Sequence, residues 1–261
     1  MTLDPALALP AAHTSADLEA ARVPTITAAQ WREVVRITEA ETGPSRRQTI
    51  ELAGFQLALA ALDTLGGGWE HASVLVLAGP GGTGATGVAA ARHLANRGLE
   101  VVVVSARRPA EADGVLGQQL LALGETPARL LAFSAAFEVA AFDLVIDAVL
   151  GRGLQDAPRA AVMGLVRATE AARGPVLSAD IPSGLDPDTG EAPGAVVQAT
   201  RTLAFGLPAR ALDVARGGEL WLADIGLTPG AYARAGLVVP PLFGPAARIP
   251  LADRLARNGG A

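Results

Sequence analysis

Three short segments of the sequence carry the residues that could do chemistry. The first is the glycine-rich stretch Gly79–Gly87, which reads GPGGTGATG and follows a run of apolar residues. Glycines lack a Cβ atom, so a ligand can approach the backbone closely, and the N–H groups at the start of a following helix favour anions. The pattern G-x-G-x-x-G occurs twice here, and its position between a predicted strand and a predicted helix makes it a more specific indication of binding. The stretch is therefore a predicted phosphate-binding turn, with a tight turn that binds nothing as the alternative.

The other two segments place an aspartate directly after an apolar run. Asp147 begins the sequence DAVLGRGL, and Asp180 begins DIPSGLD, which also contains Ser183. A buried carboxylate needs a partner, so an acid at the end of a buried strand is a candidate for function. Two acids and a hydroxyl beside an anion-binding turn would suit a hard cation together with a phosphate. The alternative is that both aspartates only cap neighbouring helices.

The composition excludes several kinds of chemistry. The chain has no cysteine and no lysine, so it has no thiolate metal site, no cysteine nucleophile, no Schiff-base lysine and no P-loop lysine. No G-x-S-x-G elbow is present, which disfavours Ser-His-Asp hydrolysis, and His93 is predicted to be a packing residue. The formal net charge of −5, with scattered arginines, argues against a nucleic-acid partner.

Alternating strands and helices must position these segments. Two capping-box patterns, Thr27 with Gln30 and Ser45 with Gln48, predict two initial helices. This rhythm predicts an α/β fold, a three-layer αβα sandwich around a Rossmann-like, doubly wound, mostly parallel sheet whose strand ends meet at one crevice. Apolar runs predict strands at 74–78, 101–104, 129–133, 144–149, 176–179, 200–205 and 219–225, with helices between most of them.

The length of 261 residues is compatible with one large domain. We place this domain at 23–245, after an N-terminal tail at 1–22 and before a C-terminal tail at 246–261. No apolar run reaches the roughly 18 residues that a membrane span needs. The first residues also lack the basic segment of a secretory signal. We therefore expect a soluble protein in the cytoplasm, with no membrane partner.

Four blocks of the sequence resemble one known family. VLVLAGPGGTGATGVAAARHL, FDLVIDAVLGRGL, LSADIPSGLDPDTG and GELWLADIG follow the order and spacing of the YjeF N-terminal domain family, the NAD(P)H-hydrate epimerases. The resemblance runs from Thr27 to Leu237 or thereabouts. It implies a Rossmann-like homodimer and an isomerase that interconverts the R and S forms of hydrated NADH and NADPH, which are substrates rather than cofactors. A separate NAD(P)H-hydrate dehydratase would then complete the repair of the cofactor.

The resemblance also implies roles for individual residues. It implies one potassium ion per subunit with Thr83, Asp147 and Ser183 as ligands, and it makes Asp180 the catalytic residue, to which we assign the acid–base step. The residues that it places against the substrate are Gly82, Thr83, Gly84, Ala85, Thr86, Gly151, Arg152, Gly153, Leu154, Gln155, Asp156, Ala157 and Asp180.

The glycine turn departs from the family pattern. The family usually reads G-x-G-N-N-G-G-D-G, whereas this chain has Gly-Thr in place of Asn-Asn and Ala-Thr in place of Gly-Asp. A lysine that often follows the sixth strand is absent near Arg210. Two alternatives stay open: a non-catalytic relative that binds a nucleotide-like ligand or a protein as a scaffold, and an NADP-dependent oxidoreductase. In the oxidoreductase, Arg107 and Arg108 after the second strand would bind the 2′-phosphate.

Overall fold

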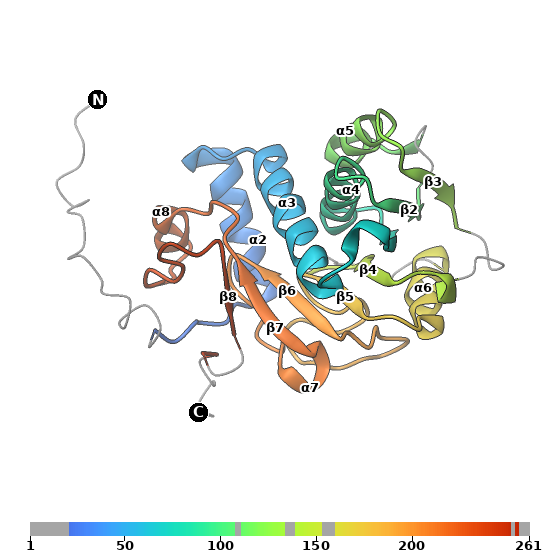
Figure 1. Cartoon of the computed structure of the whole chain (residues 1–261). Helices are drawn as coiled ribbons and strands as arrows, with labels where there is room; N and C mark the ends of the chain where they lie inside the picture. The colour runs from blue at the N-terminus through green and yellow to red at the C-terminus, as the bar shows by residue number, and fades with distance from the viewer. Residues whose placement is uncertain (1–20, 108–110, 134–138, 153–159, 252–253, 256–261) are drawn as a thin grey trace.

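The fold is built on one eight-stranded sheet, seen in a computed structural model (Figure 1). The structure describes residues 21–107, 111–133, 139–152, 160–251 and 254–255. The strand order is β3-β2-β1-β4-β5-β6-β7-β8, and all neighbours are parallel except β7 and β8. The predicted α/β class is confirmed. The strands are β1 Ser73–Ala78, β2 Glu100–Ser105, β3 Arg129–Ala132, β4 Leu144–Ala148, β5 Val176–Ala179, β6 Arg201–Phe205, β7 Glu219–Ala223 and β8 Arg248–Pro250.

Helices cover both faces of this sheet. α3 (Arg46–Leu65), α4 (Gly82–Ala95) and α5 (Gly114–Leu123) bury their apolar side chains on one face. α6 (Ala160–Ala168) packs on the other face. Three layers follow from this arrangement (Figure 1). The remaining helical segments are α2 Ala28–Ile37, η2 Thr38–Thr42, η3 Trp69–His71, η5 Val139–Ala141, η6 Thr169–Ala171, α7 Val214–Gly217 and α8 Pro229–Arg234.

Strands β1 and β4 are neighbours although two strands separate them in the sequence. The chain first winds outward to β3 and then returns to the other side of β1, which creates a switch point where α/β proteins bind ligands. The N–H of Gly79 donates to the carbonyl of Ala148 at 3.0 Å. The glycine turn and the loop after β4 therefore leave the sheet side by side.

The two predicted capping boxes begin α2 and α3. In each, the N-cap hydroxyl accepts from the backbone N–H of the glutamine three residues later. The glutamine Oε1 in turn accepts from the backbone N–H of the N-cap residue. These bonds satisfy N–H groups that the helix itself leaves free. Both helix starts are thus set by local sequence, at Thr27 and Ser45.

The ends of the described chain meet near the last strands. Val23 forms a parallel bridge with Leu255, and β8 pairs with β7. Residues 246–261, expected as a tail, thus include a strand of the sheet. No helix in the described part of the chain is long and apolar enough to cross a bilayer.

Candidate functional site

A pocket of about 520 Å³ opens at the carboxyl ends of the strands, between the glycine turn and helices α2 and α3. This volume suits a small-molecule ligand. Its inner wall includes Thr83 after β1, Arg152 after β4 and Asp180 after β5. Three separate loops therefore converge here, as the parallel topology requires.

The glycines of the turn divide into two groups. A Cβ atom on Gly79 would lie 1.8 Å from the carbonyl oxygen of Val149, and one on Gly84 would lie 1.8 Å from that of Gly79. These two glycines are required by the packing of the protein's own backbone. Gly81 has nothing within 4 Å of such an atom, so its backbone is open to a ligand.

The residues after Gly81 begin α4. Gly82, Thr83 and Thr86 line the pocket, whereas Gly84 and the buried Ala85 do not. Thr86 donates its hydroxyl to the carbonyl of Gly82 at 3.1 Å. Because the first N–H groups of a helix have no partner within the helix, this edge of the pocket favours an anion.

Asp180 is held on the pocket wall by an ion pair with Arg152. Arg152 Nε donates to Asp180 Oδ2 at 2.9 Å, and Nη2 donates to Oδ1 at 2.6 Å. The backbone of Asp180 is left-handed, with φ of 74°, which is uncommon for a residue other than glycine. Both oxygens and the backbone therefore fix the direction of this carboxylate.

The rest of the Arg152 side chain is also engaged. Nη1 donates to the carbonyl of Leu207 at 2.6 Å and Nη2 to that of Phe205 at 3.0 Å. The guanidinium lies 4.0 Å from the ring centroid of Trp31, and the side chain is fully buried. The expected contact between Arg152 and the substrate stays a prediction: Arg152 lines the pocket, and its polar atoms bind Asp180 and two carbonyls.

Asp147 lies in a second buried cluster. Its carboxylate accepts from Ser183 Oγ at 2.6 Å, from the Ser183 N–H at 2.9 Å and from Ser178 Oγ at 2.8 Å. Burial raises the pKa of Asp147 above its usual value, and the hydrogen bonds from Ser183 and Ser178 oppose this shift. Two of the three predicted metal ligands, Asp147 and Ser183, are thus in direct contact.

The loop after β4 joins this cluster to the pocket. The N–H of Leu150 donates to Ser183 Oγ at 2.8 Å. The next residue, Gly151, is so close to the turn that a Cβ on it would lie 2.1 Å from Thr83 Oγ1 and 3.6 Å from Asp180 Oδ2. Thr83 therefore adjoins Asp180 through Gly151. Among the residues that the structure describes, no group of three or more His, Asp or Glu residues could hold a metal.

Arg107 lies away from the pocket, and other expected residues are not described by the structure. Arg107 does not line the pocket, and its N–H donates to Ser105 Oγ at 3.1 Å. His93 contacts Glu51 at 2.8 Å, as suits a packing residue. The segment Gly153, Leu154, Gln155, Asp156 and Ala157 lies outside the described residues, as does Arg108.

Helices α2 and α3 add site residues that the motifs did not indicate. Trp31 and Arg32 come from α2, and Arg46 comes from the first turn of α3. No binding motif in the local sequence distinguishes any of the three from other helix residues. Only the packing of α2 and α3 against the strand ends brings these side chains to the pocket.

Comparison with known proteins shows close relatives. Residues 47–211 match the family described as YjeF-related protein N-terminus. An NAD(P)H-hydrate epimerase of Dehalogenimonas lykanthroporepellens is 40% identical over 212 residues, which are 81% of this chain and 86% of that protein. An NAD(P)H-hydrate epimerase of Leuconostoc mesenteroides is 32% identical over 207 residues, or 77% and 90% of the two chains.

A longer relative and a solved structure also match this chain. A bifunctional NAD(P)H-hydrate repair enzyme Nnr of Hyperthermus butylicus is 38% identical over 74% of this chain, but the match covers only 37% of that protein. The crystal structure of yeast ynu0 superimposes with a TM-score of 0.72 at 20% identity, covering 87% of this chain and 99% of that one. This likeness supports the fold alone. The family match and the sequence identities together show that the chain belongs to the YjeF-related protein N-terminus family.

Proposed function

We propose that this protein is an NAD(P)H-hydrate epimerase, an isomerase that interconverts the R and S forms of hydrated NADH and NADPH. The observation that carries the proposal is the Asp180 carboxylate, held by Arg152 on the wall of a pocket that also includes the glycine turn. Relatives that match over most of their length bear the same name. The hydrated cofactor is the substrate.

Asp180 is the proposed acid–base group. Epimerisation moves a hydroxyl from one face of the nicotinamide ring to the other, which requires assisted proton transfer. A positioned carboxylate can supply this assistance. The ion pair with Arg152 and the left-handed backbone hold the carboxylate in one direction, which reduces the entropy cost of reaching the reactive pose. Arg152 is a positioning residue in this scheme.

A potassium ion is the second part of the proposal. Asp147 is buried and has no cationic partner among the described residues, and a buried carboxylate needs a compensating charge. Its carboxylate and the hydroxyl of Ser183 are hard oxygen donors, which suit a hard cation. Thr83 is a further ligand by resemblance, and its Oγ1 adjoins Gly151 in the joining loop. When bound, the ion would supply positive charge near the glycine turn.

The biological setting follows from the same resemblance. We infer a homodimer in the cytoplasm that works with an NAD(P)H-hydrate dehydratase specific for one epimer. NADH and NADPH hydrates share the ring on which Asp180 would act, so both are proposed substrates.

A non-catalytic, ligand-binding relative is the second candidate. It is favoured by Thr86, which stands where the family usually has an acid and which bonds to the carbonyl of Gly82. The two candidates share the pocket and differ in turnover. An assay of turnover therefore separates them.

The test mixes the purified protein with the R form of hydrated NADH and a dehydratase specific for the S form. We expect the protein to accelerate consumption of the R form. The matched control for an Asp180→Asn variant is Asp143→Asn, which removes one carboxylate charge at the opposite end of the strands. Asp143 accepts hydrogen bonds from Ser73 there, and its variant should keep the rate. Absence of acceleration by the wild-type protein would reject the epimerase and leave the non-catalytic candidate.

A further inference from the structure

We infer that Arg46 and Arg32 recognise the phosphate groups of the substrate at the mouth of the pocket. This inference rests on the proposed function and assigns the part of the substrate that each side of the pocket binds. Both residues line the pocket, and both are exposed. Neither lies in a motif that indicated ligand binding, although Arg46 lies within the capping box of Ser45 and Gln48.

Arg46 lies against the accessible part of the glycine turn. Its Nη2 is 3.1 Å from the place where a Cβ on Gly82 would be, so the missing side chain leaves room for the guanidinium. Among the described residues, the ionic partner of this group is Glu39, whose Oε1 is 3.4 Å from Nη1, and the two side chains are 51% and 32% exposed. An exposed pair at this distance contributes little. A phosphate can therefore replace Glu39 as the partner of Arg46 at small cost.

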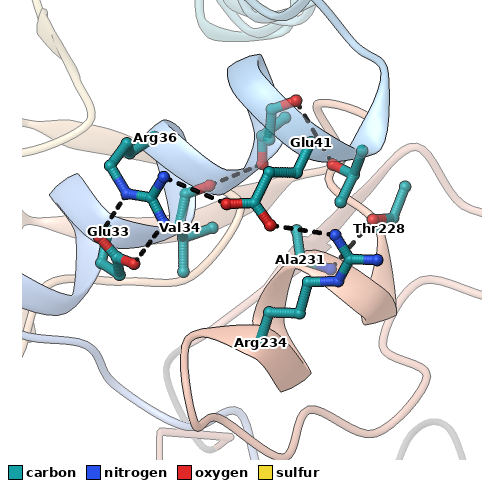
Figure 2. A network of polar contacts seen from close by, with 9 residues as sticks. Glu33, Val34, Arg36, Glu41, Thr228, Ala231 and Arg234 are labelled. Atoms are coloured by element: carbon teal, nitrogen blue, oxygen red, sulfur yellow. Dashed lines mark hydrogen bonds and ion pairs between the residues drawn. The ribbon is translucent and has the colours of Figure 1, made fainter.

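Arg36 also lines the pocket but is already engaged. Its Nε and Nη2 donate to Glu33 at 2.9 and 2.8 Å, and its Nη1 donates to Glu41 at 3.1 Å. Glu41 in turn holds Arg234 of α8 at 3.1 Å, and Figure 2 shows the resulting network between α2, η2 and α8. The donors of Arg36 are thus used to hold these helices together.

Arg32 has the free donors that Arg36 lacks. It lies one helical turn before Arg36 on α2, on the same face. Its side chain makes no hydrogen bond or ion pair with any residue that the structure describes. An arginine fork matches two phosphate oxygens. In a chain of net charge −5, two arginines with exchangeable or free donors at one mouth indicate an anionic ligand.

The inner wall of the pocket, here called its floor, carries no net charge from Asp180 and Arg152. Asp180 and Arg152 neutralise one another there, and Trp31 covers the guanidinium. The uncharged hydrated nicotinamide ring suits this floor. The pyrophosphate, and in the NADPH form the additional 2′-phosphate, then belong at the arginine mouth.

The test measures binding of ADP-ribose and of its 2′-phosphate by titration calorimetry, with nicotinamide riboside in its reduced form, which has no phosphate and an uncharged ring, as a third probe. We expect Arg46→Gln and Arg32→Gln each to weaken binding of at least one phosphate probe about fivefold to tenfold, with nicotinamide riboside unchanged. Loss for both phosphate probes assigns the residue to the pyrophosphate, and loss for the second probe alone assigns it to the 2′-phosphate. Glu39→Gln should tighten binding of ADP-ribose, because it frees Arg46.

Arg97→Gln is the matched control. Arg97 is an exposed arginine just beyond the opposite end of α4, so the variant changes the net charge equally and should bind the probes like the wild type. Unchanged affinity in both Arg46→Gln and Arg32→Gln, an equal loss in Arg97→Gln, or no binding of ADP-ribose by the wild type would overturn the inference.

Epimerase turnover in the same variants separates this inference from the proposed function. We expect KM to rise and kcat to stay constant, because phosphate contacts are made equally in the ground and transition states. A protein that loses ADP-ribose affinity in Arg46→Gln but never epimerises would retain phosphate recognition and lose the proposed function. A protein that epimerises with unchanged KM in both arginine variants would retain the function and lose the inference.

Discussion

The buried ion pair of Asp180 and Arg152 costs folding free energy that a contribution to stability does not explain. A buried ion pair is weak evidence for stability, since its desolvation often cancels its attraction. A non-glycine residue with φ of 74° adds strain of about 1–3 kcal/mol. Strain and buried charge that face a pocket together are typical of a functional site. This reasoning favours Asp180 as the acting carboxylate and Arg152 as its support.

Asp180→Asn tests this pair in two ways. We expect kcat to fall at least about a hundredfold, the scale of acid–base assistance. We also expect the free energy of unfolding to fall by about 3–5 kcal/mol, because the fully buried Arg152 loses its counter-charge. Turnover is measured with the coupled assay and stability by urea unfolding.

The double variant Asp180→Asn with Arg152→Met is the control for misfolding. It removes both charges, so stability should recover in part while activity stays lost; the carbonyls of Leu207 and Phe205 still lose the donors of Arg152. An Asp180→Asn protein that turns over at the wild-type rate would exclude Asp180 as the acid–base group.

Helices α3, α4 and α5 pack against one another, and this packing sets the position of the glycine turn. Gly54 of α3 permits a close crossing, since a Cβ on it would lie 2.4 Å from that of Ala89 on α4. Glu51 of α3 binds His93 at 2.8 Å and Gln119 of α5 at 3.0 Å, and it also pairs with Arg92. The first turn of α4 lines the pocket, so a shift of this helix would move pocket residues. The contacts of Glu51 and Gly54 therefore hold the site in position although they lie outside it.

The same cluster predicts acid sensitivity. Burial lowers the pKa of His93 below its ordinary value of 6.5, although Glu51 opposes this shift. The folded state therefore binds the proton less readily than the unfolded state, and stability should decline as the pH falls below about 6.5. Burial alone would raise the pKa of Glu51, but its hydrogen bonds from Gln119 and Arg92 lower it, so a further decline is expected below its ordinary value of 4.5.

His93→Gln separates the two contributions. Between pH 6.5 and the range where Glu51 titrates, the variant should lose less stability than the wild type, because it lacks the contribution of His93. Urea unfolding at a series of pH values measures this. Parallel pH profiles for the two proteins would contradict the assignment.

The topology of the whole molecule explains why one edge of the sheet collects the site. Returning from β3 to the far side of β1 places the loops after β1 and β4 together, and β5 follows as the next neighbour. Strand-end residues separated by a hundred positions thereby converge. The same arrangement places the buried Asp147 cluster directly beside the pocket, joined to it by Leu150 and Gly151.

Potassium should stabilise the whole fold if it binds this cluster. We expect the melting temperature to be higher in potassium chloride than in choline chloride at equal ionic strength, by about 2–4 °C for each kcal/mol of binding. Because burial raises the pKa of Asp147, protons compete with the ion, and the difference should shrink as the pH falls. Asp147→Asn should abolish it. Equal melting temperatures of the wild type in both salts would remove potassium from the proposal.

Local patterns were sufficient for the order of the first seven strands, the two capping boxes and the segments that carry the glycine turn, Asp147 and Asp180, but they did not indicate β8. Periodicity and capping act over a few residues, so they can be read without a structure. Packing between distant segments decided the rest. This packing pairs Arg152 with Asp180 and brings Trp31 and Arg46 to the pocket. It also brings Asp147 into contact with Ser183 next to the joining loop. The direction of a side chain at a strand end depends on one backbone angle and on neighbours far away in the chain, and neither is recorded in local sequence.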